Sequence, residues 1–294
     1  MFRRQKILLA LLEQFGGELS RTRMQKLLFL YCEQNADPIY GFVPYKYGCF
    51  SFQAAADKRK LTEKGLLDDS DNWRLTKRSG HAEKLNYQER QALWSLNNRF
   101  RNSSQKDLIR HVYISYPYFA TRSEIAGKYL SQDECDIVTG CVLKVKGASI
   151  CSIGYEGLLL EEYLNKLIRY NVRLVCDVRK NPLSRKFGFS KKSLSSALDH
   201  MGIEYRHFPE LGIVADKRKQ LNNQADYDDL FDEYEKTTLK DAYASVIEIA
   251  NIFKDKERIA LLCFEKLPEQ CHRTRILNAM SAYLHKANYT IYTE

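Results

Sequence analysis

The sequence has no run of about 18 consecutive apolar residues, the minimum length of a candidate membrane-spanning helix. Its first residues are basic, but Glu13 and Gln14 soon interrupt the apolar run that follows, so no secretory signal peptide is indicated. Internal repeats and low-complexity segments are also missing. We therefore expect a cytoplasmic protein without membrane contact, in which the eight cysteines stay reduced rather than forming disulfides.

Positive charge is in excess. The chain has 46 Lys and Arg against 37 Asp and Glu, a net charge of +9, which favours an anionic partner such as a nucleotide or nucleic acid. Its 294 residues, 44% of them hydrophobic, suffice for two domains with separate cores. We predict a binding module over 1–80, a helical linker region over 81–145 and an α/β domain over 146–294.

The first segment has the pattern of a small helical module. Residues 3–15 carry apolar side chains at helical spacing, and Ser20 is expected to cap a second helix. A third helix is expected from near Ser51, followed by a hairpin over 66–75. Helices followed by a short hairpin occur in this order in winged helix-turn-helix modules. We therefore expect a mostly helical, winged-helix-like N-terminal domain.

Basic and aromatic side chains of this module suit contact with DNA or a protein partner. The candidates are Arg21, Arg23, Lys46, Tyr47, Lys58 and Arg59. The alternative is that the aromatic side chains belong to the core and Lys46 is a solvated charge. The stretches MQKLLFLY at 24–31, YGFVPYKYGCFSF at 40–52 and LTEKGLL at 61–67 resemble the Panacea-type helical domain, which implies a binding module. Cys49 departs from that pattern, which commonly has proline there.

From residue 148 onward, short apolar runs alternate with helical segments. We expect strands at 150–153, 172–176, 203–207, 259–263 and 289–292. Strands alternating with helices predict a mainly parallel, doubly wound α/β sheet. Ligands of such sheets bind beyond the carboxyl ends of the strands.

Polar side chains stand where that rule places a ligand. They follow four of the predicted strands or open the helix after one, and they are Gly154, Tyr155, Asp177, Arg179, Ser184, Arg185, His207, Cys263, Glu265, Cys271, His272 and Arg273. We predict that they converge on one polar pocket. Several of them also have a structural alternative: Gly154 makes a tight turn, Asp177 and Arg179 form an ion pair, and His207 and Cys263 belong to the core.

The same residues carry a family resemblance. The stretches are SIGYEG at 152–157, DVRKNPLSRKFGFSK at 177–191, GIEYRHFPELG at 202–212 and LLCFEKLPEQCHR at 261–273. With these motifs, residues 150–294 resemble the family catalogued as domain of unknown function 488. The resemblance implies an α/β domain with a polar pocket and leans towards nucleotide or nucleic-acid processing.

Roles follow from the residue types. Glu265, Asp177, His207 and Cys271 are the catalytic candidates, with Glu265 as the main acid/base. Ligand or phosphate binding is assigned to Gly154, Tyr155, Arg179, Ser184, Arg185, Cys263, His272 and Arg273. Cys263, Cys271 and His272 are ligand types of zinc, but the adjacent Cys271-His272 pair lacks the usual spacing, so we expect no metal and no cofactor.

The leading hypothesis is an enzyme that acts on a nucleotide or nucleic acid, either as a hydrolase or by cleaving a glycosidic bond. One alternative is a non-catalytic nucleotide sensor or DNA-binding regulator. Another is an accessory protein of DNA repair or phage defence whose pocket receives a base or strand end. A further alternative is a thiol enzyme that uses Cys271 at a helix start.

Overall fold

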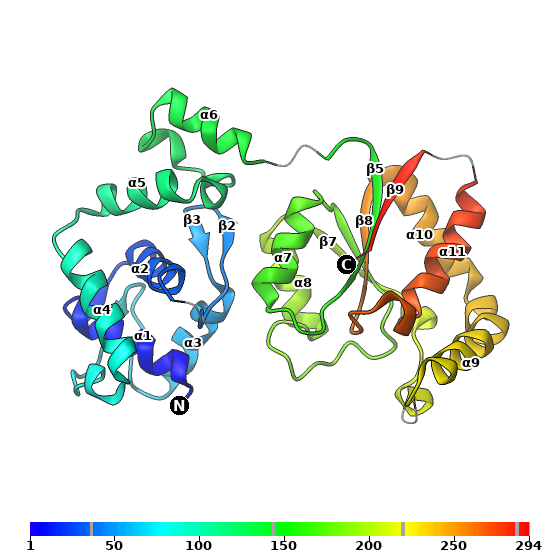
Figure 1. The fold of residues 1–294 in the computed structure, drawn as a ribbon, viewed down its shortest axis with the longest axis horizontal. Helices are drawn as coiled ribbons and strands as arrows, with labels where there is room; N and C mark the ends of the chain where they lie inside the picture. Colours follow the sequence, from blue (N-terminus) through cyan, green and yellow to red (C-terminus); the bar gives the residue numbers. More distant parts are fainter. Residues whose placement is uncertain (36–37, 143–144, 219–220, 286–287, 294) are drawn as a thin grey trace. The chain divides into compact units, whose positions relative to one another are not determined.

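The computed structural model describes residues 1–35, 38–142, 145–218, 221–285 and 288–293. The chain divides into two compact units, Met1–Val142 and Leu143–Glu294, which we describe separately (Figure 1). Among the described residues, no helix combines the length and the hydropathy that crossing a membrane requires.

The first unit is mostly helical. Its α-helices are α1 (Arg3–Gln14), α2 (Arg21–Glu33), α3 (Phe52–Glu63), α4 (Tyr87–Phe100), α5 (Gln105–Ser115) and α6 (Gln132–Gly140). Its strands are β1 (Glu18–Leu19), β2 (Val43–Tyr45), β3 (Gly48–Phe50) and β4 (Trp73–Arg74). As predicted, Ser20 caps α2, because its side chain accepts a hydrogen bond from the backbone N–H of Arg23.

The strand pairing of this unit includes a short form of the predicted hairpin over 66–75. Leu67 and Leu75 form an antiparallel bridge, flanked by backbone hydrogen bonds from Asp68 to Arg74 and from Thr76 to Leu66. Strand β4 pairs antiparallel with β1, which precedes α2, and β2 pairs with β3. The strand after α3 therefore returns to the start of the unit, and the winged-helix interpretation stays a prediction.

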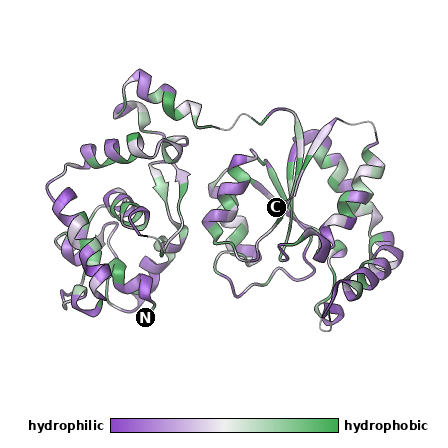
Figure 2. Cartoon of the chain, in the orientation of Figure 1, coloured by the Kyte–Doolittle hydropathy of each residue, from purple (hydrophilic) through white to green (hydrophobic). Residues whose placement is uncertain are grey.

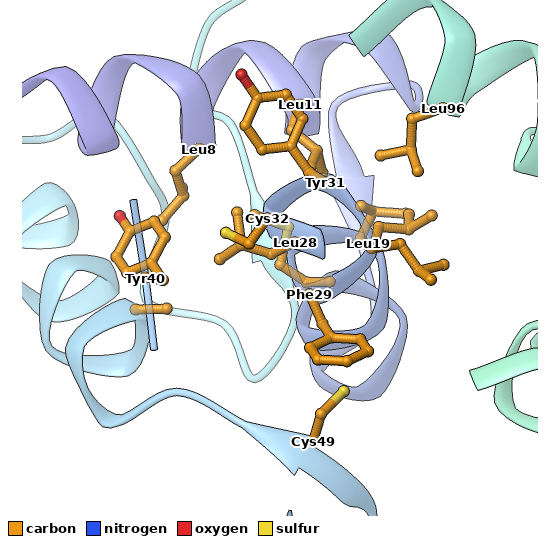
Figure 3. Packing of buried hydrophobic residues seen from close by; sticks show 14 of the residues in the cluster. Leu8, Leu11, Leu19, Leu28, Phe29, Tyr31, Cys32, Tyr40, Cys49 and Leu96 are labelled. Carbon is orange, nitrogen blue, oxygen red and sulfur yellow. The ribbon is translucent and has the colours of Figure 1, made fainter. Parts of the chain in front are cut away.

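One hydrophobic core serves the whole first unit. Leu8 and Leu11 of α1 pack with Leu28 and Phe29 of α2, and Leu96 of α4 joins them (Figure 3). Residues beyond 81 thus share a core with the first helices. The predicted division into 1–80, 81–145 and 146–294 stays a prediction, and residues 143 and 144 beside its second boundary lie outside the described residues.

The second unit is built on a five-stranded parallel sheet, which confirms the predicted fold class. Its strands are β5 (Ala148–Gly154), β6 (Leu174–Asp177), β7 (Glu204–His207), β8 (Arg258–Cys263) and β9 (Tyr289–Thr293). Their order is β7-β6-β8-β5-β9, and every pairing is parallel. Apolar residues are concentrated along the three central strands β6, β8 and β5 (Figure 2), which are almost completely buried.

Helices cover both faces of this sheet. They are α7 (Leu160–Arg169), α8 (Lys191–His200), α9 (Gln224–Tyr234), α10 (Tyr243–Lys256) and α11 (Arg273–Leu284). Helices α7 and α8 lie on one face and α9 to α11 on the other (Figure 1). Because side chains of a strand alternate between faces, Cys176 and Cys263 point into the core under α9 to α11, whereas Asp177 points to the α7–α8 face.

Candidate active site at the carboxyl edge of the parallel sheet

Two clusters of polar side chains lie at the carboxyl edge of the sheet. The aspartate cluster, on the α7–α8 face, consists of Tyr155, Asp177, Arg179, Tyr205 and His207. The thiol cluster, on the α9–α11 face, consists of Arg218, Cys263, Glu265, Cys271 and His272. A hydrogen bond from His272 Nε2 to the carbonyl of Val178, 3.0 Å long, joins the two. The residues predicted for one pocket therefore lie close together, but on both faces of the sheet.

Arg179 is the centre of the aspartate cluster. Its Nε donates to Asp177 Oδ1 at 2.8 Å and its Nη2 to Asp177 Oδ2 at 2.6 Å. Its Nη1 donates to the hydroxyl of Tyr155 and to the carbonyl of Phe189. Arg179 is 6% exposed and Asp177 is fully buried. This ion pair is the structural alternative that the sequence left open for Asp177 and Arg179. Its hydrogen bonds, with those to Tyr155 and Phe189, occupy most of the Arg179 donors that a phosphate would need.

Charge and burial act together on this cluster. Burial lowers the pKa of Arg179, but the hydrogen bonds and the charge of Asp177 outweigh burial and raise the pKa above its ordinary value. Tyr205 donates its hydroxyl proton to Asp177 at 2.7 Å. Burial and the Asp177 charge raise the pKa of Tyr205, so this hydroxyl remains a donor at neutral pH.

His207 and Ser184 support this side of the edge. His207 Nε2 donates to the carbonyl of Arg179 at 2.8 Å, and Lys191 approaches its Nδ1 at 3.4 Å. The backbone N–H of Ser184 donates to the Ser190 side chain just before α8. These contacts hold the loop between β6 and α8, while Arg185 on the same loop is exposed.

The thiol cluster assembles side chains from the end of β8 and the start of α11. Cys263 Sγ lies 2.9 Å and Cys271 Sγ 3.3 Å from Glu265 Oε2. His272 Nδ1 lies 3.8 Å from the first sulfur and 3.9 Å from the second. The two cysteines and the histidine are buried, while the Glu265 side chain is 16% exposed. Of these four residues, Glu265 is therefore the one that solvent or a ligand can reach.

Arg218 completes the cluster from the loop before α9. Its guanidinium forms an ion pair with Glu265 Oε1 and donates to His272 Nδ1 at 3.0 Å. Since His272 Nε2 donates to the Val178 carbonyl, the ring carries its proton on Nε2. Nδ1 therefore carries a lone pair, which accepts the Arg218 hydrogen bond and lies within 3.9 Å of both sulfurs.

The two thiols share their protons unequally. Burial opposes ionisation of Cys263, but the hydrogen bond from Cys271 and the positive charge of Arg218 bring the pKa of Cys263 well below its usual range. Burial and the neighbouring Cys263 sulfur raise the pKa of Cys271. Cys263 is thus the readily ionised member of the pair, whereas the sequence had pointed to Cys271.

Gly154 and Arg273 fix the backbone next to Glu265. A Cβ on Gly154 would lie 1.9 Å from the Glu265 carbonyl oxygen, so only glycine fits where β5 passes this loop. Arg273 is fully buried; its Nη2 donates to the same carbonyl at 2.9 Å and its Nε to Ser152 at 3.0 Å. Within the described part of the chain its Nη1 has no hydrogen-bond partner. Burial places Arg273 under the site rather than in it.

A small cavity of 170 Å³ opens beside the thiol cluster. Its lining residues are Lys180, Gly212, Ile213, Val214, Lys217, Leu230, Tyr234 and Thr238. The ring of Tyr234 packs edge-on against His272, with centroids 5.6 Å apart. Lys180 is exposed and forms no ion pair with the described residues. The cavity is therefore lined both by the cation Lys180 and by Tyr234, which contacts the thiol cluster.

The six predicted contact residues of the first unit fall into two groups. Arg21 pairs with Asp71, Arg23 donates to the carbonyls of Phe100 and Ser103, Lys46 pairs with Glu124, and Lys58 donates to the carbonyl of Ser70. Tyr47 and Arg59 are exposed. The first group holds the unit's own loops, although the Arg21 and Lys46 side chains are also exposed, and the second is accessible to a partner.

Sequence reasoning missed several participants. They are Ser152, Lys180, Tyr205, Arg218 and Tyr234. Arg218 belongs to a basic run, DKRK at 216–219, in which no pattern distinguishes one cation from the next. The alternation of side chains along its strand makes the face on which Tyr205 lies predictable. Its partner Asp177 could not be predicted, because that contact depends on the pairing of β6 with β7.

Taken together, the fold and the two clusters define an α/β domain with a polar site at the carboxyl edge of a parallel sheet. Residues 159–280 match the family described as Domain of unknown function DUF488, which confirms the resemblance predicted for the C-terminal half. The matched range lies in the second unit and contains the whole thiol cluster. No curated protein and no solved structure was found to match the chain. The N-terminal resemblance stays a prediction.

Proposed function

We propose that the second unit hydrolyses a phosphate-bearing nucleotide or nucleic acid at the carboxyl edge of its sheet. The observation that carries the proposal is the position of Glu265. Its carboxylate is fixed at the end of a buried strand, bound to Arg218 and packed against two sulfurs, yet it remains partly exposed. A positioned carboxylate at a strand end is suited to general acid/base catalysis of hydrolysis.

The surroundings of Glu265 suit a nucleotide. Arg218 and Lys180 supply cations for phosphate, the former on Glu265 itself and the latter in the adjoining cavity. Phe264, next to Glu265, is 45% exposed, and an exposed aromatic ring offers a stacking surface for a base. We assign anion contact to these cations rather than to Arg179 and Arg273, since those two are buried and bonded within the protein.

A substrate screen with the full chain tests the proposal. Labelled single- and double-stranded DNA and RNA oligonucleotides, nucleoside phosphates and nucleosides are incubated with the protein, and products are separated by chromatography. We expect turnover of one phosphate-bearing class and none of the matching nucleosides. Tight nucleotide binding without any product would reject hydrolysis in favour of the non-catalytic sensor.

For the first unit we propose contact with DNA through α3. Arg59 and Lys60 are exposed on this helix. The R59A/K60A double variant is expected to weaken DNA binding and to reduce the slope of log affinity against log salt by about 2. Fluorescence titration of a labelled duplex at several salt concentrations measures both. Lys106→Ala removes an exposed cation from α5 and is the matched control. Salt-independent or absent DNA binding by the wild type would make a protein the preferred partner.

A further inference from the structure

The thiol cluster has the ligand atoms and the spacing of a metal centre. Sγ of Cys263, Sγ of Cys271, Nδ1 of His272 and a carboxylate oxygen of Glu265 all lie within 4.8 Å of one another. Ligand atoms of a tetrahedral zinc site, at bond lengths of about 2.0–2.3 Å, are about 3.3–3.8 Å apart. His272 Nδ1 lies 3.8 and 3.9 Å from the two sulfurs, close to the upper end of that range, and Glu265 Oε2 lies 2.9 and 3.3 Å from the same sulfurs, at or below its lower end. An ion fits with only small side-chain movements.

The histidine is already oriented as a ligand. Its Nε2 donates to the Val178 carbonyl at 3.0 Å, which leaves a lone pair on Nδ1, within 3.9 Å of both sulfurs. Metal-binding histidines almost always donate their second nitrogen to a carbonyl or carboxylate in this manner. Arg218 now donates to Nδ1, and an ion would replace this one hydrogen bond while the Arg218–Glu265 ion pair remains.

Charge also fits an ion. Two thiolates balance a divalent cation, and Arg218 balances Glu265, so an occupied cluster adds no net charge to a buried site. Without an ion, two cysteines, which are weak donors, must satisfy a carboxylate oxygen and each other. Sulfur and imidazole ligands favour zinc over magnesium or calcium.

We propose that Cys263, Cys271 and His272 bind one zinc-type divalent ion whose fourth position faces Glu265. Adjacent Cys271 and His272 reach the same ion because they precede α11, where the backbone does not yet impose helical spacing on their side chains. Two cysteines and one histidine form one of the ligand sets found in catalytic zinc sites, which keep a fourth position for water or substrate. Zinc deaminases combine a similar set with a glutamate that is not a ligand. The sequence-based expectation of no metal rested on the missing close-pair spacing of zinc ligands. The fold brings Cys263, Cys271 and His272 together without that spacing.

Metal content of the full chain tests the site without any substrate. After zinc loading and desalting, wild-type protein is expected to retain about one equivalent, measured by mass spectrometry of the metal. Cys271→Ala and Cys263→Ala are expected to bind more than about 100-fold more weakly, because even changes around the ligands cost 10–100-fold. Cys176→Ala, a buried cysteine of β6 outside the cluster, is the control and should retain the ion.

Two further readouts keep the proposal open to refutation if a variant does not fold. Cobalt added to metal-free wild type should give an intense thiolate-to-cobalt absorption band, and zinc should displace it. Glu265→Gln should retain the ion, since the carboxylate faces the fourth position. Wild type without retained zinc and without this band would overturn the site, and equal loss of zinc in Cys176→Ala would do the same. Loss of zinc in Glu265→Gln as severe as in Cys271→Ala would overturn the open position.

The site stands on its own geometry and does not depend on the proposed hydrolysis. Zinc retention in a protein that turns over no substrate leaves the metal site in place and removes the hydrolase. Turnover by a protein that retains no zinc after loading does the reverse.

Discussion

Asp177→Ala is expected to lower the free energy of unfolding of the second unit by about 3–5 kcal/mol, because breaking a buried ion pair leaves the other charge uncompensated. Asp177 is fully buried; it accepts two hydrogen bonds from the buried Arg179 side chain and one from the half-buried Tyr205. Removing its carboxylate leaves the buried Arg179 charge without its partner. The effect is larger than that of any exposed ion pair of this chain.

Amide hydrogen exchange of peptides from β6 and β8 measures this change within the second unit. Both tryptophans, Trp73 and Trp94, belong to the first unit, so their fluorescence serves as an internal reference that should not change. Glu248→Ala removes an exposed partner of Arg206 in the same unit and should cost less than about 1 kcal/mol.

A second substitution separates lost charge compensation from lost packing. Replacing Arg179 by Met in the Asp177→Ala background removes the uncompensated charge, so part of the stability should return. A cost below about 1 kcal/mol for Asp177→Ala alone would contradict the structural role of the pair. No recovery in the double variant would locate the loss in packing instead.

Much of the second unit could be predicted because its local patterns agree with its tertiary structure. The apolar runs at 150–153 and 259–263 became β5 and β8. Strand ends could therefore be located, and with them Glu265 and Cys263. The pattern of the first unit was less informative, since β4 also pairs with β1, a strand that precedes both α2 and α3.

The division of the site into two clusters could not be predicted from the strands one at a time. It depends on register: Asp177 lies beside Leu262 rather than Cys263, which puts the aspartate and the thiol on opposite faces. The metal-like spacing of the thiol cluster also depends on the tertiary structure. Cys263 and His272 are separated along the chain, and only the turn between β8 and α11 brings them together.

Glu265→Gln is expected to lower the turnover number of the substrate found in the screen by about 10²–10⁴-fold, the usual contribution of a positioned acid or base. The amide keeps the size of the side chain but cannot take up the proton. Substrate affinity should change little, because Arg218, Lys180 and Phe264 remain. The loss should therefore appear in kcat rather than in the binding constant.

Glu156→Gln is the matched control. Glu156 is exposed at the same edge, where its carboxylate accepts a hydrogen bond from the backbone N–H of Lys266 at 3.1 Å. Since it lies outside both clusters, its replacement should change turnover by no more than about twofold. A general loss of charge at the edge would affect both variants alike.

Single-turnover kinetics of the wild type, Glu265→Gln and Glu156→Gln on one substrate, with the binding constant measured on the same samples, test the role of Glu265 most directly. General acid/base catalysis by Glu265 predicts a rate constant at least about 100-fold lower for Glu265→Gln alone, at nearly constant affinity and melting temperature. Equal turnover by all three proteins would contradict the assignment of the chemistry to Glu265 and the thiol cluster around it.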